Sequence, residues 1–163
     1  MSAPDKSHVR GMNAIKPGDT SSIIAVCCLG IILALVLGVG LASHLVLRHL
    51  VQTAPLWICV VLGFRCSRAT YWAGLPLFLF WLILMALIWT YLLGISHFLS
   101  GHFSPIEIVM TLIVGASSVV GMGSLIRSKF SFSPAGAAVL FVVMAIIQVV
   151  CFRLSLLPSI AHR

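Results

Sequence analysis

Acidic residues are almost absent from this 163-residue sequence, which contains only Asp5, Asp19 and Glu107. Charged residues of both signs make up 8% of the chain, whereas soluble domains carry about 25%. Because so little charge is present, a water-soluble globular domain is excluded. Glu107 is the one acid near the apolar interior of the sequence, so a pair of intramembrane carboxylates for acid–base catalysis is excluded as well.

The signatures of familiar enzyme and cofactor sites are also missing. The five cysteines are an odd number and show no CxxC spacing, which predicts no disulfide framework. No P-loop, GxSxG, HExxH or Rossmann motif occurs in the sequence. We therefore expect no catalytic residue and no cofactor.

Apolar residues dominate what is present. They make up 61% of the chain, and the mean hydropathy is +1.17. The net charge is +7, but the basic residues lie in tails and loops, where they set topology and contact anionic lipid headgroups. We therefore predict an integral membrane protein whose partner is the lipid bilayer, and we expect no nucleic-acid binding.

Four apolar stretches are long enough to cross a membrane, which takes about 20 residues. Lipid offers no partner for backbone polar groups, so these spans must be helices. We predict an all-α, up-down bundle of four transmembrane helices, with a short apolar segment at the interface. The predicted parts are an N-terminal tail (1–22), a membrane domain (23–157) with spans 23–47, 71–98, 105–125 and 134–157 and the interfacial segment 56–64, and a C-terminal tail (158–163).

Small residues indicate where these helices pack. Faces of small residues let helix backbones approach closely, and we expect them to pack within the bundle, with a dimer seam on the first span as the alternative. The residues are Gly30, Ala34, Gly38 and Ala42 in the first span, and Gly115 and Gly121 in the third. In the fourth span, Gln148 is a candidate for a hydrogen bond between helices.

The orientation of the four predicted spans is not decided by counting charge. Both termini would share one side, and Lys and Arg then number five on each side. The connection 99–104 contains no Lys or Arg, which is typical of an external loop. We therefore predict that the first and third loops (48–70 and 126–133) are cytoplasmic and that both termini are external.

The stretch RCSRATYW, residues 65–72, combines basic and aromatic side chains just before a span. Arg65 and Arg68 lie three residues apart, and Tyr71 and Trp72 follow. Guanidinium groups suit the depth of lipid phosphates, and aromatic rings suit the membrane interface. We predict that these four residues anchor the chain to anionic headgroups.

The same four residues resemble a known signature. Small bacterial inner-membrane proteins of the YhaH-like family, whose function is unknown, carry a G-R-x-x-R-x-x-[YF]-W pattern at the start of a helix. Phe64 stands here where glycine is usual. The resemblance implies a bacterial inner membrane and a cytoplasmic position for Arg65 and Arg68, and it implies no activity.

Histidines near the third span raise the question of a metal site. His97, His102 and Glu107 follow one another at intervals of five residues, whereas metal ligands on a helix are usually three or four apart. These residues are the candidate ligands of a surface metal. The alternative, which we expect, is that the histidines lie at the interface and bind no metal.

The stretch FSPIEIVM, residues 103–110, contains the signals of a helix start. Ser104 fits the N-cap, Pro105 the first helical position and Glu107 the third, which is the S-x-x-E capping box. Ser133 precedes Pro134 in the same way at the fourth span, but no acid follows. We therefore interpret Glu107 as a helix cap at the interface rather than a proton site within the membrane.

Three functions remain in view. The first, which we favour, is a non-enzymatic accessory or assembly subunit that binds other membrane proteins, or itself, through its small-residue faces. The second is a small oligomeric transporter or channel, although ionisable groups near the midplane, which transport usually needs, are nearly lacking. The third is a membrane protein that binds haem or a metal.

If Glu107 acts as a cap, replacing it with glutamine is expected to leave folding nearly intact, because the glutamine side chain also fits a capping box. The thermal unfolding midpoint of Glu107→Gln in detergent, compared with that of the unmodified chain, measures this. A clear loss of function with an unchanged midpoint would contradict the interpretation of Glu107 as a cap alone.

Overall fold

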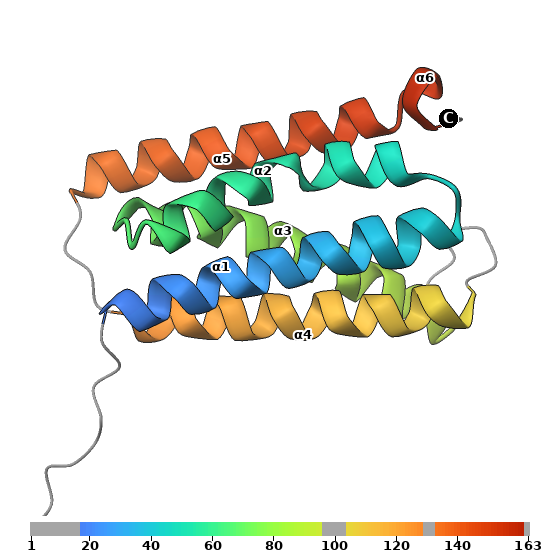
Figure 1. Ribbon diagram of the computed structural model, residues 1–163, viewed down its shortest axis with the longest axis horizontal. Helices are drawn as coiled ribbons and strands as arrows, with labels where there is room; N and C mark the ends of the chain where they lie inside the picture. The colour runs from blue at the N-terminus through green and yellow to red at the C-terminus, as the bar shows by residue number, and fades with distance from the viewer. Residues whose placement is uncertain (1–16, 96–103, 129–132, 162–163) are drawn as a thin grey trace, which may run out of the picture.

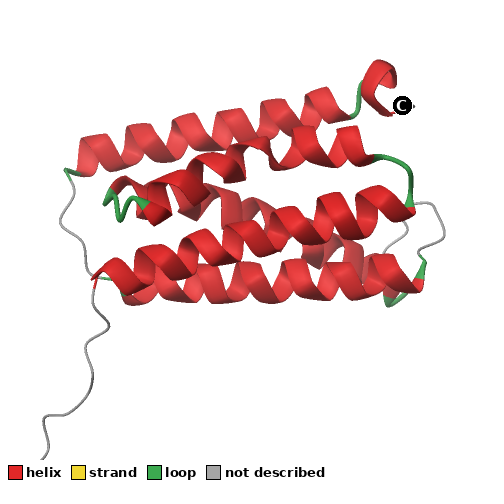
Figure 2. Cartoon of the chain, in the orientation of Figure 1, coloured by secondary structure: helices red, strands yellow, loops and turns green. Residues whose placement is uncertain are grey.

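The part of the chain that the structure describes folds almost entirely into helices. The computed structural model describes residues 17–95, 104–128 and 133–161, and these contain no strand (Figure 2). The elements are α1 (Pro17–Leu33), η1 (Ala34–Gly40), α2 (Val46–Phe64), α3 (Ala69–Leu92), α4 (Pro105–Arg127), α5 (Pro134–Ser155) and α6 (Pro158–Ala161). η1 is a π-helix that continues α1 without a break. The predicted all-α fold is confirmed.

Five helices, rather than the predicted four, are long and apolar enough to cross a membrane. They are α1 together with η1, α2, α3, α4 and α5. Three of them, α3 to α5, correspond to the predicted second, third and fourth spans. The additional one is α2, and the first predicted span is divided between α1–η1 and the start of α2.

α2 replaces the predicted loop and interfacial segment. The segment 56–64 is the second half of this 19-residue helix and not a separate element. The first half carries Arg48, His49 and Gln52, which lower its hydropathy and make it resemble a loop in the sequence. In the folded chain the helical period places Gln52 and Leu56 on the buried side.

The first helix ends before the predicted boundary at residue 47. The backbone N–H of Leu45 donates to the carbonyl oxygen of Gly40 at 2.9 Å, and His44 adopts a φ of 57°. This left-handed residue reverses the chain, so α2 can begin at Val46. At the other end α1 begins at Pro17, within the stretch predicted as an N-terminal tail.

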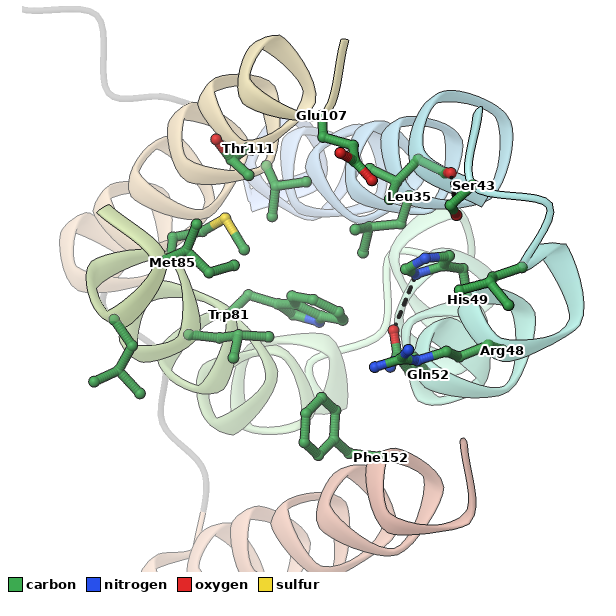
Figure 3. Close-up of a pocket in the computed structure, with 16 residues that line it drawn as sticks. Leu35, Ser43, Arg48, His49, Gln52, Trp81, Met85, Glu107, Thr111 and Phe152 are labelled. Atoms are coloured by element: carbon green, nitrogen blue, oxygen red, sulfur yellow. Dashed lines mark hydrogen bonds between the residues drawn. The ribbon is translucent and has the colours of Figure 1, made fainter. Parts of the chain in front are cut away.

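The five long helices form a ring. α1 packs on α2 and α4, α3 packs on α4 and α5, and α2 packs on α5. Looking along the bundle, the order is therefore α1, α2, α5, α3, α4, as Figure 3 shows. Within the described part of the chain, α4 and α5 do not contact each other.

Successive helices are joined at alternate ends of the bundle, so the two termini of the described chain lie at opposite ends (Figure 1). This differs from the predicted placement of both termini on one side, because α2 adds a helix. We call the end that holds the start of α1 and Arg65, Arg68 and Arg127 the basic end. The opposite end holds the turn between η1 and α2 and the end of α5.

Glycines allow the closest helix contacts. A Cβ built on Gly63 of α2 would lie 2.8 Å from the carbonyl oxygen of Ser21 in α1. A Cβ built on Gly121 of α4 would lie 2.5 Å from the ring of Phe78 in α3. Neither position has room for a methyl group, so these glycines set the distance between the helices.

The other predicted packing residues lie in varied surroundings. In α1 and η1, Gly30 faces Ser117 of α4 and Gly38 faces Met110 of α4. Ala34 is buried, whereas Ala42 is exposed, and a Cβ on Gly115 would meet nothing within 4 Å. The small-residue face of the first span therefore packs against α4, within the chain.

Gly121→Ala is expected to destabilise the bundle by about 1–3 kcal/mol, as overpacking does, because the new methyl group would meet the buried ring of Phe78. Gly115→Ala is the matched control on the same helix, and it should be neutral or stabilising by up to about 1 kcal/mol through helix propensity. Thermal unfolding in detergent, followed by circular dichroism, compares the two. Equal midpoints for the two variants would contradict the packing described here.

Candidate functional site

A cavity of about 390 Å³ lies inside the helix ring, in the half away from the basic end. Its walls come from η1, the first half of α2, the second half of α3 and the first half of α4, with one residue of α5. It is lined by Leu35, Val39, Ser43, Leu45, Arg48, His49, Gln52, Trp81, Leu84, Met85, Leu87, Ile88, Glu107, Thr111, Val114 and Phe152 (Figure 3). Apolar side chains form most of this surface, and three of the polar ones, Arg48, His49 and Gln52, lie on α2.

His49 and Gln52 of α2 belong to one hydrogen-bonded network. The ring nitrogen Nδ1 of His49 lies 3.1 Å from Oε1 of Gln52. Nε2 of Gln52 donates to Oγ of Ser155 at 3.0 Å, and that hydroxyl donates to the carbonyl oxygen of Phe152 at 2.6 Å. The network therefore fixes the Gln52 amide and ties α2 to the end of α5.

Gln148 of α5 adds a second connection to α2. Its Nε2 donates to the backbone carbonyl oxygen of Gln52 at 3.2 Å, so the interhelical hydrogen bond predicted at this residue is present. Pro55 lies inside α2, and a proline removes one hydrogen bond from the helix ladder and bends it. The side-chain oxygen of Gln148 is buried and has no partner within the described part of the chain.

Two hydrogen-bond donors at the cavity have no acceptor. Nε of Arg48 and Nε1 of Trp81 are both buried and unpaired among the described residues. Trp81 is 1% exposed, so bulk solvent does not reach its ring. Figure 3 shows the indole of Trp81 and the guanidinium of Arg48 directed toward each other across the cavity.

Glu107 is both a helix cap and a wall of the cavity. Its Oε2 accepts hydrogen bonds from the backbone N–H and the hydroxyl of Ser104, at 2.7 Å and 2.9 Å. Its own backbone N–H donates to Oγ of Ser104 at 3.3 Å, which completes the capping box. The carboxylate thus lies where the sequence pattern places it, and the same residue also lines the cavity.

The cavity is closed on the side that faces the basic end. Trp81 and Val114 line it there, and one helical turn further along α3 lie Leu77 and Phe78, which are 0% exposed. Ile31 of α1, also fully buried, belongs to the same packed cluster. Because this core fills the other half of the ring, the cavity is a pocket rather than a pore through the bundle.

The predicted headgroup anchors lie at the basic end, far along the helices from the pocket. Arg65 and Arg68 are exposed, and Trp72 is half-buried. Tyr71 differs from the prediction, because it is buried and its phenol oxygen accepts a hydrogen bond from Oγ of Ser21 at 3.1 Å. Its position three residues into α3 turns the ring inward, against α1, and not toward the interface.

The remaining candidates are a cap and a possible metal site. Oγ of Ser133 accepts from the backbone N–H of Gly136 at 3.2 Å, so Ser133 is the N-cap of α5. His97 and His102 lie outside the described residues. The described residues hold no group of three or more His, Cys, Asp or Glu side chains placed to bind a metal.

The sequence reasoning did not identify most of the pocket's polar residues. Arg48, His49 and Gln52 lay in a stretch interpreted as a loop, and Trp81 lay in the middle of a span without a distinguishing motif. The available signal was periodicity, because Gln52, Leu56 and the later buried residues of α2 recur at helical spacing.

Comparison with known proteins does not add to these observations. No protein-family model, no curated protein and no solved structure matches the chain.

Proposed function

We propose that this chain is an integral membrane protein that binds a small amphipathic molecule in the pocket inside its helix ring, without catalysing its conversion. The observation that carries this proposal is the presence of two unsatisfied donors, on Arg48 and Trp81, at a largely apolar cavity of about 390 Å³. Ligand sites commonly have this volume, this apolar lining and only a few convergent polar groups.

A binding role agrees better with this geometry than conduction does. The packed cluster around Phe78 and Ile31 fills the ring between the pocket and the basic end. A transport path would require that this core separate, and the polar or weakly polar groups in the described cluster are the thiols of Cys27, Cys28 and Cys59, the phenol of Tyr71 and the indole of Trp81. A channel or transporter therefore remains the less supported alternative.

Assembly with another membrane protein is a second candidate, and it does not compete with ligand binding. Gly115 and Gly123 lie eight residues apart on α4, and a Cβ on either would meet nothing within 4 Å. Small residues on an open helix face permit close approach of another helix. This face is distinct from the first-span face, which packs within the chain.

The distribution of basic residues supports an orientation for the five helices. If all five cross the bilayer, the segments at the basic end carry Lys6, Arg10, Lys16, Arg65, Arg68, Arg127 and Lys129, and those at the pocket end carry Arg48, Arg153 and Arg163. Since cytoplasmic segments carry the excess of Lys and Arg, the basic end is cytoplasmic and the pocket lies toward the opposite face. The YhaH-like resemblance implies the bacterial inner membrane as the location.

This orientation predicts that a membrane-impermeant maleimide does not label Cys66 in right-side-out vesicles and does label it once the membrane is permeabilised. Cys66 is the exposed cysteine, whereas Cys27, Cys28 and Cys59 are buried and Cys151 is half-buried. In a Cys66→Ser background, Ser159→Cys in α6 should show the reverse accessibility. Labelling of Cys66 in sealed vesicles would contradict the proposed orientation.

For the proposed function, we expect a small molecule to remain bound when the protein is released from native membranes into the gas phase and weighed by mass spectrometry. Val39→Phe should remove it, because the larger side chain fills the pocket that Val39 lines. Val119→Phe is the matched control, because Val119 is 60% exposed on α4 and away from the pocket. Equal retention by both variants, with unchanged helical circular dichroism, would exclude the pocket as the binding site.

A further inference from the structure

We propose, building on the ligand-binding function above, that the pocket selects a single-chain amphiphile with a carboxylate head. The head accepts hydrogen bonds from the guanidinium of Arg48 and from Nε1–H of Trp81. The apolar chain lies against the leucine, isoleucine and valine side chains that form the rest of the lining. A fatty acid is the simplest molecule of this class.

The positive charge of Arg48 is the feature that favours an anionic head group. Nε of Arg48 is buried and has no acceptor, and no acidic side chain of the described residues forms an ion pair with it. Arg48 as a whole is half-buried, and a buried charged donor that lacks both an acceptor and a counter-ion is costly. An anionic ligand would supply both the missing charge and the missing acceptor.

The carboxylate of Glu107 does not supply this counter-charge and acceptor for Arg48, although it lines the same pocket. It is occupied by two hydrogen bonds from Ser104, and it lies in the first turn of α4, where the helix dipole stabilises negative charge. In Figure 3, Glu107 and Arg48 lie on different walls of the pocket, with His49 between them. The positive charge of Arg48 is therefore left for a ligand.

The indole of Trp81 limits which head groups the pocket can bind. An indole N–H can only donate, and this one is buried, unpaired and directed toward Arg48. Two donors that converge favour a head with several acceptor atoms and no donors of its own. An ammonium head would leave both donors unpaired and would place two cations together.

A carboxylate fits this arrangement better than a phosphate does. A planar guanidinium can donate two parallel hydrogen bonds to the two oxygens of a carboxylate. Arg48 is the only Lys or Arg among the residues that line the pocket. A phosphate monoester carries up to two negative charges, and the second would lack a cation while Glu107 adds a further negative charge to the same pocket. We therefore expect the monoanion to bind more tightly.

The test uses the full chain in nanodiscs of zwitterionic lipid, with Trp57, Trp72 and Trp89 replaced by phenylalanine so that Trp81 is the fluorophore. Bromine-labelled dodecanoate, dodecyl phosphate, dodecanol and dodecyltrimethylammonium share one chain and differ in the head. We expect dodecanoate to quench Trp81 with an affinity about tenfold or more above that of dodecanol, the size expected for a charge-assisted hydrogen bond. The phosphate should bind more weakly than dodecanoate, and the ammonium compound should be the weakest.

Variants separate the head site from the rest of the pocket. Arg48→Gln should remove the preference for dodecanoate over dodecanol, whereas Arg153→Gln, an exposed arginine at the same end of the bundle, should retain it. Trp81→Phe keeps the ring and removes the donor, so ligand-induced thermal stabilisation by dodecanoate should fall while that by dodecanol stays the same.

The outcomes distinguish the proposed carboxylate site from the ligand-binding function on which it rests. Equal quenching by dodecanoate and dodecanol, or an undiminished preference in Arg48→Gln, would overturn the carboxylate site while the pocket still binds amphiphiles. Tighter binding of dodecyl phosphate would overturn the choice of carboxylate. Quenching by none of the probes beyond that seen for Val39→Phe would overturn the ligand-binding function itself.

Discussion

The rest of the structure depends on one constraint, which is that a polar side chain within an apolar helix has to find its partners inside the bundle. α2 carries the polar groups at issue, and its hydrogen bonds determine its neighbours. Gln52 alone connects His49 on its own helix with Ser155 and Gln148 on α5. α5 is thereby joined to α2, although the two are separated in the sequence by α3 and α4, and the ring closes around the space that becomes the pocket.

Hydropathy was a good guide where a helix contacts only apolar surroundings, and it failed where polar groups are buried. The helices α3, α4 and α5 are continuous apolar runs. Ser104 and Glu107 mark the start of α4, and Ser133 marks the start of α5, by local chemistry that a sequence displays directly. α2 was missed because Arg48, His49 and Gln52 make half of it look like a loop. The partners that make this half a buried helix lie about a hundred residues away in the sequence, where no local pattern reveals them.

The candidate site shows the same division. Glu107 was found as a cap because Ser104 and Pro105 stand beside it, but its place at the pocket depends on how α4 meets η1 and α2. Trp81 is indistinguishable in sequence from an aromatic residue that contacts lipid, and its unpaired N–H is visible only once α3 is placed against α2. Arg48 needs the same information, since an arginine near the start of a span is usually an interface anchor.

The odd number of long helices has a consequence for how such a chain can be enlarged. If all five helices cross the bilayer, the two ends of the domain lie on different sides of the membrane, and a second copy joined in tandem would be inserted upside down. Two inverted copies facing each other form the architecture from which many secondary transporters are built. Paired in this way, two pockets would face opposite compartments, and each closed core would lie beside the open half of its inverted neighbour.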